Sequence, residues 1–359
     1  MNDIAEDKEE KAPFNKWKLI IPVAIGIGVS LYLLISGFNP KALASVHLSQ
    51  KLVIGLLLGV ATVIVRDFSF MYKLRLSTGY RLGWPKTLQT IIMWEFGAAV
   101  TPKLSESAFV LYVLKKSGLT YGRSTAVMML NSFMDNLVFV TVFTTLYFIL
   151  GHQMLALSGD CPDLAGHRIL TAVRQLADKA WVGYVLMLSL CIFLAVALFI
   201  ASGATKIFFY RLAELRFLHR FEKNLHHIGE EIELTSEEYR NRSPLFWIEF
   251  YLATFVNWSA RYLLPCCLFY AFSDVPLNML AVYARQYVLW IFLVIPTTPG
   301  SSGIAEISFI AINCDFMPAG LSAAIALIWR IYGYYLYLVA GMIVLPGWVA
   351  GIVQDKEQG

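Results

Sequence analysis

Long apolar runs separated by short polar segments dominate the chain. Runs with few charged residues occupy 18–37, 52–72, 124–150, 180–202, 244–272 and 320–350. A helix of about 20 apolar residues is long enough to cross the hydrocarbon core of a bilayer. Each run is therefore predicted to form a membrane-spanning helix, and the fold class is predicted to be an all-α polytopic integral membrane protein.

Two further apolar segments, 84–117 and 276–316, are interrupted near their middles. The interruptions read "AAVTPKLSE" and "PTTPGSSG". Proline stops a helix, and backbone groups freed inside a bilayer are tolerated only where protein or a wet cavity surrounds them. We predict two re-entrant hairpins, each built from a broken helix. The alternative is two ordinary spans joined by a short loop.

The positions of Lys and Arg residues predict the orientation. They cluster in segment 203–243, in the loop after span 52–72, which includes Lys73, and in the residues before span 124–150. Cytoplasmic loops of membrane proteins are enriched in Lys and Arg, so these stretches are predicted to face the cytoplasm. Loop 151–179 and the sequence "FSDVPLN" are predicted to lie outside.

The same rule places both termini in the cytoplasm. Residues 1–17 are predicted to be a disordered cytoplasmic N-terminus, and residues 351–359 a cytoplasmic tail. Residues 18–350 then form a single transmembrane domain. The apolar core of 18–37 is longer than that of a signal peptide, which favours a retained signal anchor.

Landmarks recur along the chain at an offset of about 190–200 residues. The first half contains, in order, Arg66, Trp84-Pro85, Thr101-Pro102 and Glu106. The second half contains Arg261, Val275-Pro276, Thr298-Pro299 and Glu306. The linker helix predicted at 180–202 inverts the second half relative to the first. We predict two inverted-topology repeats, at about 52–150 and 244–350, a layout that transporters use to place a site near the bilayer midplane.

Composition supports a membrane protein and excludes several function classes. Of 359 residues, 58% are hydrophobic and 15% are charged, and the net charge is +4. This composition gives no indication of nucleic-acid binding. No CxxC motif or Cys/His cluster indicates a metal site, and no cofactor is predicted. The five cysteines are best explained as free thiols, with a bond between Cys161 and Cys314 as the alternative.

Ionisable residues inside the apolar segments are candidate functional residues. They are Arg66, Asp67, Glu95, Glu106, Asp135, Glu249, Arg261, Arg285, Glu306 and Arg330. A charge at mid-bilayer costs at least about 2.5–3.5 kcal/mol, so it should face the protein interior, a partner or water. For Arg66, Asp67 and Glu249, which lie near span ends, snorkelling towards the surface is the alternative.

The two glutamates that follow the helix breaks are the centre of the candidate site. Near a new helix start, such an acid can cap free N–H groups, while the same helix start can instead meet an anionic head group. Arg330 can pair with Glu306 or contact a phosphate in a bidentate way. The substrate-binding residues are predicted to be Arg66, Thr101, Pro102, Glu106, Asp135, Arg261, Thr298, Pro299, Gly300, Gly303, Glu306, Arg330 and Tyr334.

These motifs also resemble a known family. The spacing of Pro299, Gly303 and Glu306, the two-repeat organisation and Asp135 after the first break are similar to the membrane domain of lysylphosphatidylglycerol synthases and their flippase-like relatives. The resemblance covers about residues 18–350, without the soluble aminoacyl-transferase domain. In this chain Ser301, Ser105 and Phe109 stand where the family has two glycines and an arginine, so the family's basic contact in the first half is missing.

The resemblance implies translocation of lipids between leaflets in a bacterial-type plasma (inner) membrane. Candidate lipids are of the phosphatidylglycerol, polyprenyl-phosphate or hopanoid type, and the expected partners are membrane lipids rather than nucleic acid. One alternative is a non-transporting subunit that binds a lipid-modifying enzyme through segment 203–243, which has the spacing of an amphipathic helix and is also compatible with an interfacial position on the membrane. The other is an intramembrane enzyme, but no HExxH or GxSxG motif assigns a reaction.

Overall fold

The structure is a computed structural model of the chain. It describes residues 28, 40–44, 46–101, 103–154, 163, 171, 173, 175, 179–200, 202–214, 222–294, 301 and 303–357. All regular secondary structure in these residues is helical. The predicted span at 18–37 lies outside them, apart from Gly28.

The helices follow one another with short connections. In chain order they are α2 (Pro40–Ala44), α3 (Gln50–Ser77), α4 (Trp84–Val100), α5 (Lys103–Lys116), α6 (Tyr121–Leu150), η1 (Gly151–Met154), α8 (Ala180–Ala195), η3 (Val196–Ile200), α9 (Ser202–Ala213), α10 (Glu222–Arg240), α11 (Pro244–Phe272), α12 (Met279–Val294), α13 (Ile304–Asn313), η6 (Cys314–Phe316), α14 (Ser322–Arg330), η7 (Ile331–Tyr335) and α15 (Leu336–Glu357).

Most predicted spans are confirmed as helices. Within the described residues, 4 helical stretches are long and apolar enough to cross a membrane, namely Gln50–Ser77, Tyr121–Leu150, Ala180–Ile200 and Ser322–Trp348. Predicted span 244–272 forms α11, a helix of 29 residues. At 1.5 Å per residue a helix of this length exceeds the hydrocarbon thickness. It is not among those 4 stretches, and it carries Glu249, Asn257 and Arg261 in its sequence.

Both interrupted segments are confirmed as pairs of helices. The first pair, α4 and α5, is separated by Thr101 and Pro102. The second pair, α12 and α13, is separated by residues 295–303. Thr101 adopts an extended conformation with φ −107° and ψ 147°, as the residue before a proline usually does. The helices therefore end and begin on either side of the stretches where the sequence predicted breaks.

Local signals fix where the long helices begin. The side-chain oxygens of Ser49, Thr120 and Ser243 accept hydrogen bonds from the backbone N–H groups three residues further on, at the starts of α3, α6 and α11. Such caps satisfy N–H groups that have no partner within the helix. Pro244 also occupies the first turn of α11, where its missing N–H costs nothing.

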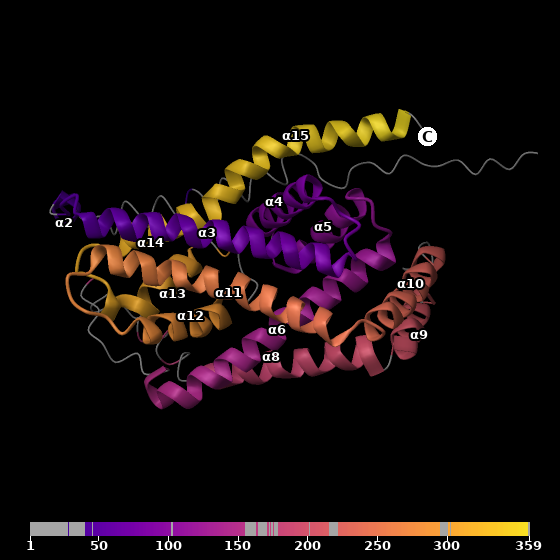
Figure 1. The fold of residues 1–359 in the computed structure, drawn as a ribbon, viewed down its shortest axis with the longest axis horizontal. Coiled ribbons are helices and arrows are strands. Elements are labelled where there is room, and N and C mark those ends of the chain that lie inside the picture. Colours follow the sequence, from indigo (N-terminus) through magenta and orange to yellow (C-terminus); the bar gives the residue numbers. More distant parts are fainter. Residues whose placement is uncertain are drawn as a thin grey trace, which may run out of the picture.

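Helices α3 and α11 run side by side through the middle of the molecule (Figure 1). Their backbones approach closely at Gly55, where an added Cβ would lie 2.9 Å from both the Cα of Ala271 and the carbonyl oxygen of Cys267. Lipid tails are as apolar as the helix surfaces, so close packing at small residues is what favours association. Around this pair, α4 of the first half packs on α15, the last helix of the second half. Helix α12 of the second half packs on α6, the last long helix of the first half.

Segment 203–243 forms a helical pair, α9 and α10, at the end of the molecule opposite α2 (Figure 1). Helix α10 packs on α9 and α6. The Tyr239 hydroxyl, on α10, donates to the carbonyl of Ser77 at 2.6 Å, and Ile232 and Ser236 are fully buried. The apolar face of α10 is therefore used within the fold.

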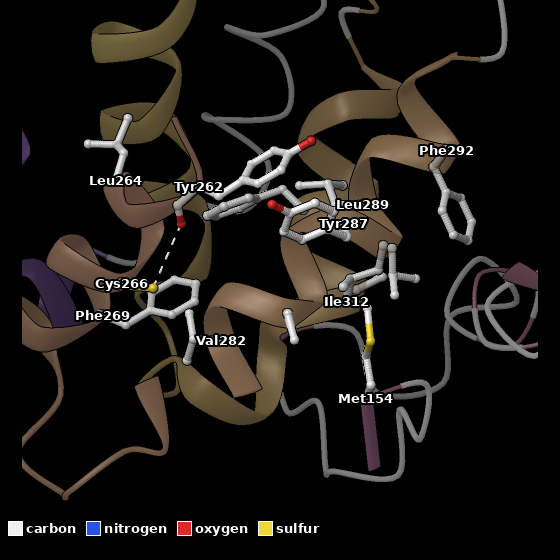
Figure 2. Close-up of a cluster of buried hydrophobic side chains, with 14 of the residues drawn as sticks. Met154, Tyr262, Leu264, Cys266, Phe269, Val282, Tyr287, Leu289, Phe292 and Ile312 are labelled. Carbon is white, nitrogen blue, oxygen red and sulfur yellow. Dashed lines mark hydrogen bonds between the residues drawn. The ribbon is translucent and has the colours of Figure 1, made fainter. Parts of the chain in front are cut away.

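A second packing centre lies among α11, α12 and α13 (Figure 2). Phe269, Val282 and Phe309 are fully buried there. The Cys266 thiol donates a weak hydrogen bond to the carbonyl of Tyr262, with 3.7 Å between sulfur and oxygen. This cluster fixes the second helix pair against α11.

The cysteines divide into two kinds. Cys191, Cys266 and Cys267 are free thiols, as predicted. Cys314 takes part in a disulfide, so the prediction that it is a free thiol is wrong. Cys161 lies outside the described residues.

Candidate functional site

A cavity of about 450 Å³ lies inside the helix bundle. Helices α3, α4, α6, α11 and α12 contribute to its wall, together with residues from both helix breaks and from the region around η7. This volume is within the range of about 300–1,000 Å³ that is usual for ligand sites. The cavity is thus the place where the two halves of the chain meet.

Charged side chains of both signs line the cavity. The cations are Arg66, Lys73, Arg261 and Arg330, and the acids are Glu95, Glu106 and Asp135. Such groups are costly in a bilayer unless they are paired or face water. Each of these cations is paired with a carboxylate.

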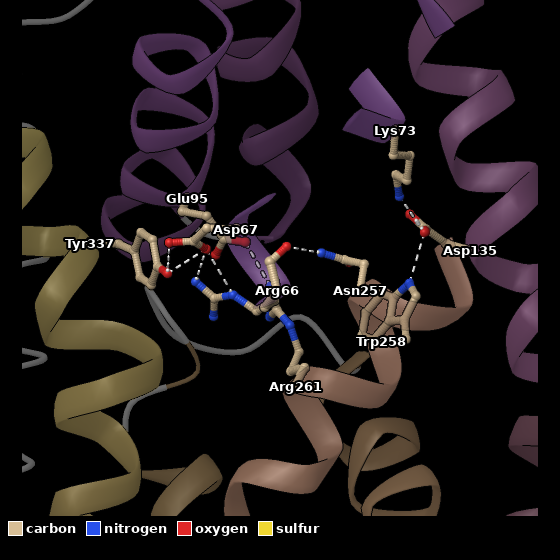
Figure 3. Close-up of polar contacts among 9 residues, drawn as sticks. All are labelled: Arg66, Asp67, Lys73, Glu95, Asp135, Asn257, Trp258, Arg261 and Tyr337. Carbon is tan, nitrogen blue, oxygen red and sulfur yellow. Dashed lines mark hydrogen bonds and ion pairs between the residues drawn. The ribbon is translucent and has the colours of Figure 1, made fainter. Parts of the chain in front are cut away.

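Arg66 and Arg261 belong to one cluster between α3, α4 and α11 (Figure 3). The Arg66 guanidinium lies 2.9 Å from Asp67, and Arg261 lies 2.7 Å from Glu95. The Tyr337 hydroxyl donates to Asp67, and the Arg66 guanidinium stacks over the Tyr337 ring at 4.3 Å. Only 3% of Arg66 is exposed, so the alternative that Arg66 snorkels to the surface is wrong.

Asn257 ties the two central helices together beside this cluster. Its side-chain N–H donates to the carbonyl of Arg66 at 2.9 Å (Figure 3). One turn after Arg261 on α11, Pro265 also lines the cavity. Proline has no N–H to donate to the carbonyl of Arg261, which weakens the helix at the cavity wall.

Lys73 and Asp135 form a second charged group (Figure 3). Their Nζ and Oδ1 atoms are 2.5 Å apart, and the indole N–H of Trp258 donates to the same oxygen at 2.8 Å. The prediction that Lys73 lies in a cytoplasmic loop is wrong, because α3 continues to Ser77 and buries it. Lys73 therefore supplies a cation of the first half to the cavity wall.

Arg330 and Glu306 form a third group. The Arg330 Nε donates to Glu306 Oε1 at 2.8 Å, and the N–H of Gly303 donates to Oε2 of the same acid at 2.7 Å. Glu306 therefore caps α13 and pairs with Arg330 at the same time. Each side chain is 8% exposed.

The backbone at the second break is unusual. Gly303 has a φ of 88°, and Ser301 has a φ of 52°, both in the left-handed region that favours glycine. A glycine at position 301 would adopt this conformation with less strain than Ser301 does. The same conformation turns the chain so that the Gly303 N–H points back to Glu306.

Aromatic rings cover another part of the wall. Trp258 and Trp290 contact each other with ring centres 4.6 Å apart, and so do Tyr262 and Tyr287. All four residues line the cavity. Aromatic faces attract cations, so the wall next to Asp135 suits positive charge as well as apolar groups.

The structure brings most predicted site residues to one place. Those that line the cavity are Arg66, Thr101, Glu106, Asp135, Arg261, Arg330 and Tyr334. Glu306 accepts hydrogen bonds from Arg330 and from the backbone of Gly303. Pro102, Thr298, Pro299 and Gly300 lie outside the described residues. The predicted substrate-binding set omitted Lys73, Trp258 and Tyr337, and it also omitted Glu95, which the sequence had indicated as a candidate functional residue. For Lys73, the signal in the sequence was that the hydrophobic residues Leu74 and Leu76 follow it, so the helix continues past it.

Outside the bundle, large apolar side chains are exposed on the span helices. Examples are Leu57 and Ile64 on α3, and Leu186 and Phe193 on α8, each at least 60% exposed. A charged interior with an apolar exterior is the reverse of a soluble domain. Among the described residues, no three His, Cys, Asp or Glu side chains lie close enough to hold a metal ion.

Comparison with known proteins adds three findings. A family model described as the lysylphosphatidylglycerol synthase TM region matches residues 19–341. A UPF0104 membrane protein from Archaeoglobus fulgidus is 23% identical over 306 residues, which cover 80% of this chain and 85% of the relative. No solved structure matches.

Proposed function

Because the chain belongs to the family of lysylphosphatidylglycerol synthase transmembrane regions, as its motifs predicted, we propose that it moves a polar or anionic lipid between the two leaflets of a membrane. The observation that carries the proposal is the charged cavity that lies among apolar helices. No covalent chemistry is part of this function.

The physical barrier to lipid movement is the head group. A charged head group loses its water when it crosses the hydrocarbon core, at a cost of several kcal/mol. Side chains that line a cavity inside the protein replace that water. The acyl chains meanwhile remain in the bilayer against the apolar exterior of helices such as α3 and α8.

The cavity wall suits a phosphate-containing head group. Arg66, Arg261 and Arg330 offer planar guanidinium groups that bind phosphate oxygens in a bidentate way. Their carboxylate partners hold them in place before the lipid arrives. A head group that binds one of these cations must therefore displace a carboxylate, which makes binding sensitive to head-group charge.

The alternative of a subunit that binds a lipid-modifying enzyme gains no support from α10. Its apolar face packs on α6, and Tyr239 bonds to the end of α3. We further propose that the protein acts in a bacterial-type plasma membrane with both termini in the cytoplasm. The concentration of Lys and Arg in segment 203–243 supports this orientation.

A vesicle assay tests the proposal. Protein is reconstituted with tail-labelled phosphatidylglycerol or a labelled polyprenyl phosphate, and an impermeant reductant destroys the label in the outer leaflet. The protein should expose the inner-leaflet label to the reductant, and Arg261→Gln should slow this strongly. The matched control, Arg242→Gln, removes a surface ion pair outside the cavity and should leave the rate unchanged. Rates equal to those of protein-free vesicles for every lipid tried would refute the proposal.

A further inference from the structure

The ion pairs around the cavity differ in how firmly their acids are held. Asp67 accepts hydrogen bonds from Arg66 and from the Tyr337 hydroxyl, with both of its oxygens engaged. Glu306 likewise uses one oxygen for Arg330 and the other for the Gly303 N–H. These two acids keep a partner if their arginine turns away.

Asp135 is held in a different way. Within the described part of the chain, both donors to it, Lys73 Nζ and the Trp258 indole N–H, reach the same oxygen, Oδ1. It lies in the middle of α6, away from the N-terminus of that helix. If Lys73 turns away, Asp135 keeps a single neutral donor. Its side chain is 28% exposed. A carboxylate that loses its cation while an anionic group comes close favours the protonated form.

Lys73 is suited to change partners. Among the cations of the cavity wall it is the lysine, a compact charge on a flexible stem, whereas the other three are planar arginines. Its Nζ bonds to Asp135 and lies 5.4 Å from the ring centre of Phe70. A single ammonium can be transferred from a carboxylate to a phosphate without breaking a two-pronged contact.

We propose that Lys73 and Asp135 form a proton-binding site that couples lipid binding to proton uptake. This inference rests on the proposed lipid translocation. When an anionic head group binds the Lys73 ammonium, the Asp135 carboxylate takes up a proton from water and becomes a neutral carboxylic acid. When the head group leaves, Asp135 releases the proton and pairs with Lys73 again.

The charges balance in each step. The head group brings one negative charge into the cavity, the proton brings one positive charge, and Lys73 stays an ammonium throughout. The net charge of the protein interior is therefore the same before and after binding. This balance removes the cost of adding an uncompensated charge at membrane depth.

Other charged and titratable groups surround the pair. Those on the wall of the first half are Arg66, Glu95 and Glu106, and those of the second half are Arg261, Tyr262, Tyr287, Arg330, Tyr334 and Tyr337. Each arginine is already matched by its own acid, so the loss of Lys73 is the change that acts directly on Asp135.

Direct measurement of proton uptake tests the inference. Short-chain phosphatidylglycerol is added to the purified protein in weakly buffered detergent solution that contains a pH-sensitive dye, and bound lipid is measured in parallel. We expect one proton to be taken up per bound lipid. Asp135→Asn should abolish the uptake. Lys73→Arg should reduce it, because a guanidinium holds the carboxylate more firmly.

A matched control is available on α9. Lys206 pairs with Glu233 at 3.2 Å, outside the cavity, and Lys206→Arg should leave the uptake at the parent level. Thermal unfolding of each variant establishes that it is folded. If Asp135→Asn does not fold, Lys73→Arg carries the test alone.

The outcomes separate this inference from the proposed function. Lipid binding without proton uptake, or uptake that Lys73→Arg leaves unchanged, overturns the proton site and leaves translocation standing. Uptake in a protein that fails to move lipid in vesicles overturns translocation and retains the proton site. If phosphatidylglycerol and labelled polyprenyl phosphate neither bind nor move, both are refuted.

Discussion

The two helix breaks carry similar sequences but use their glutamates differently. After the first break, Glu106 is partly exposed and lines the cavity. After the second, Glu306 is 6% exposed, caps α13 through Gly303 and holds Arg330, which itself lines the cavity. The second acid is thus a structural partner of a cavity residue, while the first faces the cavity directly.

The difference shows that matching motifs need not have matching roles. In the second half, the acid near the break pairs with a cation on the following helix. In the first half, the acid on the following helix, Asp135, pairs with Lys73 on the preceding helix. The two halves therefore both contribute a charge pair to the cavity wall, but the acid of the pair comes from a different helix in each half.

The comparison depends on the two breaks entering from opposite sides of the membrane, which remains a prediction. Val275 and Leu234 are matched probes, because they are 64% and 66% exposed. With an impermeant thiol reagent, Val275→Cys should be labelled in intact cells, and Leu234→Cys only after permeabilisation. Both are compared with the parent protein. The opposite labelling pattern would contradict the predicted orientation.

Loss of Arg330 should have the largest effect on stability. Arg330→Met leaves Glu306 buried without its cation, and breaking such a pair typically costs about 3–5 kcal/mol. The double variant with Glu306→Gln should recover part of the loss, because no unpaired charge remains. Unfolding in detergent measures both. A double variant that also translocates lipid like the parent would limit the pair to a structural role.

Replacement of Gly303 should have a smaller effect. Its φ of 88° is unfavourable for any residue with a Cβ, so Gly303→Ala should cost about 1–2 kcal/mol. Gly347→Ala, in α15 with open space around it, should instead be neutral or stabilising by up to about 1 kcal/mol. Equal midpoints for the two variants would show that the break tolerates a Cβ.

The smallest expected effect is the pH-dependent contribution of Glu238, on α10, to stability. Burial alone would raise the pKa of Glu238, but Arg123 and Arg242 hold it below its ordinary value of 4.5. Its contribution to stability is therefore present above pH 4.5 and is lost as the pH falls through the lowered pKa. Hydrogen exchange measured as a function of pH should show that α10 becomes less protected as the pH falls. This pH dependence should be absent in Glu238→Gln and present in the control variant Glu237→Gln.

The sequence by itself determined the helices and their breaks. Apolar runs of sufficient length predicted α3, α6, α8 and α11, and prolines predicted where both hairpin segments are interrupted. These features follow from local rules, because helix length, capping and proline geometry depend on neighbouring residues. The ionisable residues within apolar runs also indicated that a polar interior exists.

The sequence indicated the pair of Glu306 and Arg330, which the structure confirms, but only the tertiary structure decided how most other cavity charges pair. Arg66 bonds to its neighbour Asp67, Arg261 crosses to Glu95 on α4, and Lys73 reaches Asp135 on α6. Such pairs depend on how helices rotate and approach one another, as at Gly55 and Ala271. Helical periodicity alone does not fix that rotation, since several faces of these helices are apolar. The long-range packing of α3 against α11 therefore set the composition of the cavity wall.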